Sequence, residues 1–113
     1  MHEYSIVQAL LDQCEAHARA NDAKKITKVE LKIGVLTGVE PHLLNVAFDT
    51  FKEKTICEEA ELVLQIQPVV IFCSECEEEF TLSEHDYTCP KCGGNLIKIL
   101  EGEEMLLMRL EMA

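Results

Sequence analysis

The chain has 113 residues, which suits one small domain, or one domain with a satellite. Its 10 basic and 21 acidic side chains give a formal net charge of −11, which repels a phosphate backbone and argues against nucleic acid as a partner. No secretory signal or membrane-spanning stretch is evident, so the six cysteines indicate a cytoplasmic protein in which reduced thiols bind metal.

The first three residues form a candidate metal chelate. A free amine on Met1, the backbone nitrogen and imidazole of His2 and the backbone nitrogen of Glu3 could surround one ion in a plane of nitrogen donors. All-nitrogen planar coordination suits Ni(II) or Cu(II). The alternative is an ordinary initiator segment in which His2 binds nothing, because a motif this short arises often by chance.

Hydrophobic periodicity predicts the elements of the first half of the chain. Apolar residues at helical spacing predict an amphipathic helix over residues 5–20, directly after the candidate chelate. Alternation predicts a half-buried strand over residues 28–35, and Glu40-Pro41 opens a second predicted helix, with proline near its first turn. The apolar stripe of that helix holds Leu43, Leu44, Ala47, Phe48 and Phe51. A second strand over residues 62–66 ends before Pro68.

Two C-x-x-C pairs are the most specific motif in the chain. They comprise Cys73 and Cys76, then Cys89 and Cys92, with twelve residues between the pairs. Two such turns can direct four thiolates to one tetrahedral zinc ion, and a site closed by four protein ligands suits a structural role rather than the activation of water. A rubredoxin-like iron site, a redox disulfide and a nucleic-acid-binding zinc ribbon are the alternatives, although the acidic residues around the motif count against the last.

The remaining cysteines and histidines carry weaker signals. Cys14 falls on the apolar face of the first predicted helix and is best read as a core residue, whereas Cys57 falls in a predicted turn with no evident partner. His17 and His42 suit surface or capping roles, and only His85 could exchange with a cysteine at the zinc. No phosphate-binding loop, nucleophile elbow or H-E-x-x-H motif is present, so catalysis has no evident apparatus and we expect no enzyme.

The last residues predict how the chain is organised. Apolar residues alternate over residues 106–112, which predicts a strand that returns to the first sheet and makes the cysteine segment an insertion. We therefore expect an α+β fold with a small sheet of about three strands, two helices and an inserted zinc-ribbon-like domain. The expected domains are residues 1–68 with 103–113, and residues 69–102.

The combination of these motifs resembles the HypA family over the whole chain. The Met1-His2-Glu3 start, the four cysteines and the strand from Leu106 to Met112 follow the order of that family. The resemblance implies nickel bound by the Met1 amine, the His2 backbone nitrogen and imidazole, and the Glu3 backbone nitrogen. It also implies structural zinc on the four thiolates.

The resemblance further implies a function and partners. Members of the family are nickel chaperones for hydrogenase maturation and, in some organisms, for urease. They work with a HypB-type GTPase, which agrees with the missing phosphate loop, and deliver nickel toward the hydrogenase large subunit. Two possibilities are left open: that urease accessory proteins are further partners, and that the chain forms a homodimer. Neither nucleic acid nor a membrane is expected as a partner.

Overall fold

The computed structural model describes residues 2–82 and 87–113, and of His2 the backbone alone. The chain forms two compact units, the first made of Met1–Leu31, Val39–Gln65 and Leu106–Ala113, and the second of Lys32–Gly38 and Ile66–Met105. The elements in chain order are α1 (His2–Ala20), β1 (Ile26–Gly34), the 3-10 turn η1 (Val35–Thr37), α2 (Pro41–Phe51), β2 (Glu61–Gln67), β3 (Val69–Cys73), β4 (Glu78–Leu82), β5 (Ile97–Glu101) and β6 (Met105–Met112).

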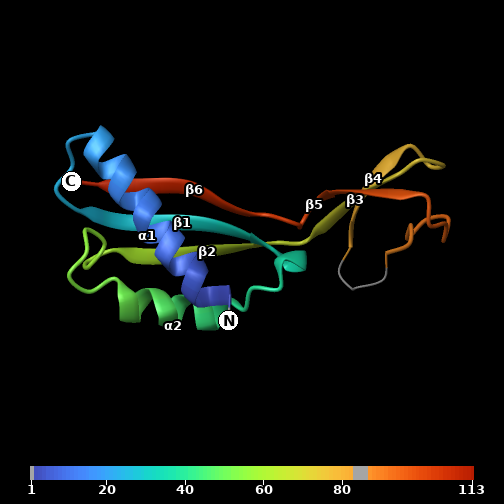
Figure 1. Cartoon of the computed structure of the whole chain (residues 1–113). Helices are drawn as coiled ribbons and strands as arrows, with labels where there is room; N and C mark the ends of the chain where they lie inside the picture. The colour runs from blue at the N-terminus through green and yellow to red at the C-terminus, as the bar shows by residue number, and fades with distance from the viewer. Residues whose placement is uncertain (1, 83–86) are drawn as a thin grey trace. The chain divides into compact units, whose positions relative to one another are not determined.

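The first unit is a three-stranded sheet in the order β2-β1-β6, with both helices packed on one face (Figure 1). The alternation predicted for β1 is confirmed, since Val29, Leu31 and Ile33 are all buried. Two backbone hydrogen bonds join Lys25 and Ala113 in the manner of antiparallel strands. The return of the C-terminal strand to the first sheet, the central topological prediction, is therefore confirmed.

Helix α1 begins three residues earlier than its periodicity predicts. His2 and Glu3 lie within its first turn rather than ahead of it. The carboxylate of Glu3 favours this early start, because a negative charge near a helix N-terminus is stabilising. The predicted core face is otherwise confirmed, with Val7, Leu10, Leu11, Cys14 and Ala18 buried.

Helix α2 begins where its capping residues predict. The Leu43 backbone N–H donates to Glu40 Oε2 at 2.8 Å, and Pro41 occupies the first turn. Leu44 and Phe48 are fully buried, whereas Leu43, assigned to the same apolar stripe, is 51% exposed. The stripe is thus wider than the surface that the rest of the unit covers.

The second unit is a separate antiparallel sheet in the order β4-β3-β5. Val69, Ile71 and Leu82 form its buried core, against which Leu36, Phe80, Ile97 and Ile99 pack. Strand β1 was expected to reach Val35, but the chain turns there into η1, because the Leu36 N–H donates to Gly102 O at 2.8 Å and the Leu36 side chain joins this core.

Residues 32–38 consequently group with the cysteine segment, which nothing in their own pattern indicates. A domain division into residues 1–68 with 103–113, and residues 69–102, stays a prediction.

Candidate metal centre

The four cysteines of the two C-x-x-C pairs come from two tight turns of the second unit. Cys73 ends β3, and the Glu77 N–H donates back to the Cys73 carbonyl at 2.8 Å, so the turn carries Cys76 beside it. The second turn closes in the same way, with the Gly93 N–H donating to the Cys89 carbonyl at 2.8 Å. Glu77 and Gly93 both adopt positive φ angles, of 54° and 72°, which the tight reversal of each turn requires.

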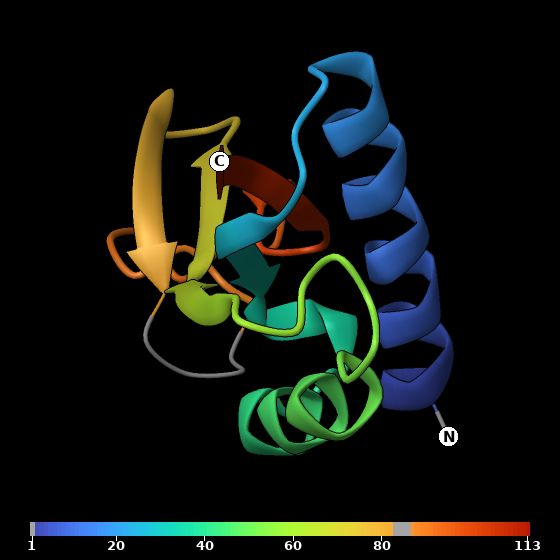
Figure 2. The ribbon, with the colours of Figure 1, turned by 90° about the vertical axis from the view of Figure 1, so that its left-hand side faces the viewer.

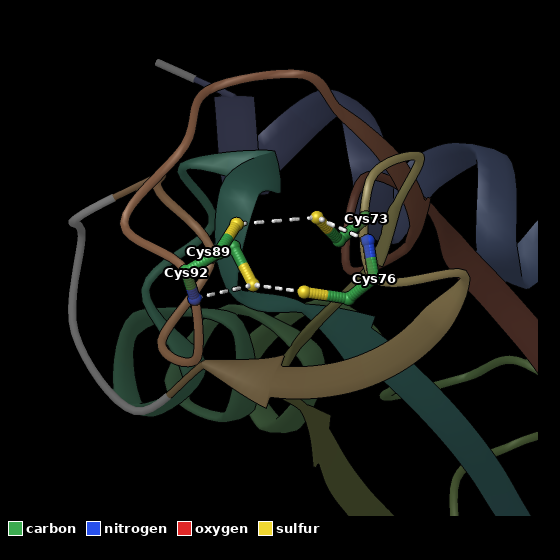
Figure 3. Close-up of side chains that lie close together, drawn as sticks. All are labelled: Cys73, Cys76, Cys89 and Cys92. Atoms are coloured by element: carbon green, nitrogen blue, oxygen red, sulfur yellow. Dashed lines mark hydrogen bonds between the residues drawn. The ribbon is translucent and has the colours of Figure 1, made fainter.

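The four sulfurs converge on one point (Figure 3). Cys73 Sγ lies 3.7 Å from Cys92 Sγ, and Cys76 Sγ lies 3.8 Å from Cys89 Sγ. Four sulfurs at about 2.3 Å from a tetrahedral zinc ion would lie about 3.8 Å from one another. The spacing of the sulfurs and the chemistry of the donor set therefore fit a structural zinc site.

Backbone amides also point at the sulfurs. The N–H groups of Lys91 and Cys92 both donate to Cys89 Sγ, at 3.4 and 3.5 Å. The Cys76 N–H lies 3.5 Å from Cys73 Sγ, and the Gly94 N–H lies 3.4 Å from Cys92 Sγ. Such bonds stabilise thiolates rather than thiols, since the charged form is the stronger acceptor.

The proton affinities of the thiols differ across the cluster. Burial alone would raise the pKa of Cys89, but the backbone N–H donors of Cys92 and Lys91 and the neighbouring thiols outweigh it and lower this pKa to about 7. Burial, followed by hydrogen bonds to the other three thiols, raises the pKa of Cys76 to about 12. Four thiolates this close repel one another, so a bound cation is needed to keep all four deprotonated.

An ion pair links the second turn to strand β4. Lys91 Nζ lies 2.7 Å from Glu78 Oε2. Both side chains are at least half exposed, so the pair contributes little to stability.

The candidate nickel residues are only partly described. The backbone of His2 and the whole of Glu3 lie in the first turn of α1, and Glu3 is the one charged side chain among the described residues that is buried, at 8% exposed. Met1 and the His2 side chain lie outside the described residues, as does His85, the candidate for ligand exchange at the zinc. Among the residues described, no group of three or more histidine, cysteine or acidic side chains besides the four-cysteine cluster could share an ion.

The structure gives Cys57 a role that its sequence position does not reveal. Cys14 and Cys57 are both fully buried in the first unit. A hydrogen bond between their thiols raises the pKa of Cys14 and lowers that of Cys57. The expectation that Cys14 is a core residue is confirmed, and Cys57 is its neighbour. The turn signals around Cys57 do not predict that this residue is buried, because Cys14, the residue beside it, is 43 residues away in the sequence.

Comparison with known proteins identifies the family. Residues 1–112 match the family model described as "Hydrogenase/urease nickel incorporation, metallochaperone, hypA". The chain belongs to the HypA family. This is a family of nickel metallochaperones for the maturation of hydrogenase and urease. The four-cysteine cluster described above could hold a metal ion and fits a structural zinc site.

Individual HypA proteins align along almost the whole chain. The hydrogenase maturation factor HypA of Shewanella baltica is 58% identical over 112 residues, covering 99% of this chain and 96% of that protein. The Aquifex aeolicus HypA is 50% identical, with 99% and 97% covered. The solution structure of the nickel metallochaperone HypA from Helicobacter pylori matches with a TM-score of 0.70 at 38% identity, covering 97% of this chain and 96% of that one. These relatives are maturation factors rather than catalysts. No helix in the described part of the chain has the length and apolar character needed to cross a membrane.

Proposed function

We propose that this chain binds one Ni(II) ion at its amino terminus and delivers it for the maturation of [NiFe] hydrogenase, with urease as a second destination in organisms that have both. The donors in this proposal are the Met1 amine, the His2 backbone nitrogen and imidazole, and the Glu3 backbone nitrogen. The protein acts as a carrier and not as an enzyme.

One observation carries the proposal at this site. Helix α1 begins at His2, so the backbone nitrogens of His2 and Glu3 lie in its first turn. N–H groups in the first turn of a helix have no acceptor within that helix. A metal ion can therefore replace the proton on both nitrogens without breaking a hydrogen bond of the helix. The negative charge of the resulting amidates also suits the positive end of the helix dipole.

Zinc serves a separate, structural purpose in this proposal. Cys73, Cys76, Cys89 and Cys92 would hold it, and it would stabilise the fold of the second unit by joining the two turns. Four protein thiolates leave no open position, so these residues have no means of presenting a water molecule for hydrolysis.

Partners would supply the energy and the destination. The chain contains no phosphate-binding loop, so a HypB-type GTPase would provide the nucleotide-dependent step. The hydrogenase large subunit would receive the nickel, and urease accessory proteins would take that part where urease is the target. The reduced thiols of the metal centre fit the cytoplasm as the place of this exchange.

The deciding experiment is a nickel titration of zinc-loaded protein. We expect one tightly bound Ni(II) in protein with a free Met1 amine and near-total loss of that site when one residue precedes Met1. His2→Ala should abolish nickel binding and leave zinc content unchanged. His17→Ala, on an exposed face of the same helix, is the matched control and should bind nickel normally.

Two outcomes would reject the proposal. Equal binding by the free and extended proteins would place nickel elsewhere in the chain. Absence of binding in every form would favour a zinc-ribbon adaptor with no nickel role.

A further inference from the structure

The four cysteines of the metal centre are unequally protected from solvent. Cys73 and Cys89 are buried, Cys76 is partly buried and Cys92 is exposed. All four would be thiolates around zinc, and a thiolate reacts with an oxidant or electrophile only where that reagent can reach it. Cys92 is therefore the sulfur of this centre that a small molecule meets first.

Gly94 keeps the approach to the Cys92 sulfur open. A Cβ atom at position 94 would lie 3.3 Å from Cys92 Sγ, closer than an ordinary contact. The Gly94 backbone donates its N–H to Cys92 Sγ at 3.4 Å and accepts the Cys89 N–H at 2.9 Å. Alanine at this position would keep both hydrogen bonds and cover the sulfur.

Glu75 places a negative charge beside the same sulfur. Its Oε2 atom lies 4.0 Å from Cys92 Sγ. At low salt a carboxylate at this distance disfavours the approach of an anion by about fivefold and affects a neutral molecule little. The way to Cys92 thus favours neutral reagents, of which hydrogen peroxide is a small example.

Cys73 is the sulfur placed to react with Cys92. Their Sγ atoms lie 3.7 Å apart, and this pair joins one turn of the centre to the other (Figure 3). Strands β3 and β4 lie side by side and antiparallel (Figure 2), and the turn between them begins at Cys73. Cys89 Sγ accepts two backbone N–H groups, whereas Cys73 Sγ accepts that of Cys76. The Cys73 thiolate consequently keeps more of its charge available for attack.

We propose that Cys92 is a modification site through which neutral oxidants and electrophiles reach the metal centre, and that a peroxide joins it to Cys73. The Cys92 thiolate attacks one oxygen of hydrogen peroxide, the O–O bond breaks, and a sulfenic acid and hydroxide form. The Cys73 thiolate then attacks the Cys92 sulfur, so that the S–S bond forms, the S–O bond breaks and a second hydroxide leaves. Two electrons pass from the two thiolates to the peroxide.

The disulfide removes two of the four metal ligands. Two remaining thiolates hold zinc too weakly to retain it, so oxidation releases the ion and leaves a covalent bond between the two turns. The zinc content of the second unit then follows the peroxide level around the protein. This inference rests on the four-cysteine centre and is independent of nickel binding.

The test treats the full zinc-loaded protein with an equimolar amount of hydrogen peroxide. A chromogenic chelator follows the zinc released, and mass spectrometry of peptides maps the disulfides after the remaining thiols are blocked. We expect the disulfide between Cys73 and Cys92 to form first, with one zinc released for each disulfide. A first disulfide between Cys89 and Cys92 or between Cys14 and Cys57, or zinc retained by the oxidised protein, would overturn the inference.

Two alkylating reagents of similar size test the role of charge. Iodoacetamide is neutral and iodoacetate is anionic, and both should modify Cys92 before any other cysteine. At low salt we expect the protein to prefer iodoacetamide about fivefold more strongly than a neutral model thiol does. Glu75→Gln should remove this extra preference, whereas Glu79→Gln, which changes the net charge equally at a position in β4, should keep it. First alkylation at Cys76, or the same preference in Glu75→Gln, would contradict the proposed approach.

Two alanine variants test the opening itself. Gly94→Ala should slow the reactions of Cys92 with peroxide and iodoacetamide by at least about threefold, because the added methyl group covers the sulfur. Gly93→Ala adds the same group in open space and should not slow them. Equal rates in the unsubstituted protein and Gly94→Ala would count against the opening. Disulfide mapping in the unsubstituted protein decides the inference even if a variant loses zinc. Failure of the nickel proposal would appear differently, as an unchanged nickel titration in His2→Ala beside a normal response to peroxide.

Discussion

Gly34 lies directly against the backbone carbonyl of Gly102, so that a Cβ atom on Gly34 would overlap that carbonyl group. The contact brings the end of β1 against the turn that follows β5, within the second unit. Two backbone hydrogen bonds fix the same junction, from the Gly34 N–H to Glu104 O at 2.9 Å and from the Leu36 N–H to Gly102 O at 2.8 Å. Glycine at position 34 is thus required by the closeness of two backbones.

Gly34→Ala should lower the free energy of unfolding by about 1–3 kcal/mol, since an added methyl group forces the two backbones apart. Urea denaturation of the zinc-loaded protein measures the change. Gly38→Ala is the control, because Gly38 has a φ angle of 76° but open space around it, so alanine there costs only backbone strain, about 1 kcal/mol. An equal or smaller loss for Gly34→Ala would show that the junction can relax.

Zinc binding should release fewer protons as the pH rises. Because the pKa of Cys89 is lowered to about 7, its thiolate is present above that pH and is protonated below it. The pKa of Cys76 is raised to about 12, so zinc must displace its proton at any pH near neutrality. The number of protons released per zinc should fall by about one between pH 6 and 8. Calorimetric titration of zinc in buffers of different ionisation enthalpy measures that number, and a constant value over the range would contradict the assignment.

Cysteine substitutions should divide the six thiols into two classes. Cys73→Ala should abolish zinc binding, because it removes one of four ligands. Cys14→Ala should leave one zinc per chain and instead lower the free energy of unfolding by about 1–3 kcal/mol, because the residue is fully buried. Elemental analysis and urea denaturation of the same samples provide both readouts. Loss of zinc from the Cys14 variant, or retention of zinc by the Cys73 variant, would be incompatible with this division.

The contribution of the Glu40 cap of α2 to the stability of the protein should be measurable by itself. Glu40→Ala removes the acceptor of the Leu43 N–H and should destabilise the protein by about 1 kcal/mol. Glu40→Gln retains a side-chain oxygen and should lose less. Thermal unfolding followed by circular dichroism distinguishes the two variants, and identical midpoints for them would mean that the charge of Glu40, rather than its hydrogen bond, is the stabilising feature.

Nickel affinity should rise with pH between about 6 and 8. The proposed donors bind Ni(II) after the His2 imidazolium and the backbone amides lose protons, so acidification should release the metal. Competition against a chelator of known pH dependence gives the profile. A flat profile would rule out coordination through deprotonated amide nitrogens.

Local patterns in the sequence predict much of the fold. The alternation around Val29 and Leu31 predicts β1, the Glu40-Pro41 pair predicts the start of α2, and the spacing of the four cysteines predicts their common centre. Each of these signals is contained within a few neighbouring residues, because the periods of helices and strands and the geometry of a C-x-x-C turn are set by the local backbone. The return of β6 was also predictable, since one face of its alternating residues needed a sheet to cover it.

Features that depend on residues far apart in the chain were decided by the tertiary structure alone. The second sheet β4-β3-β5 and the burial of Cys57 beside Cys14 both depend on such distant residues. The exposure of Leu43 and of Met108 follows from where neighbouring elements end. The sequence by itself determined which residues are apolar and which can bind metal. Only packing decided which apolar surfaces stay uncovered, because that depends on how elements distant in sequence fit together.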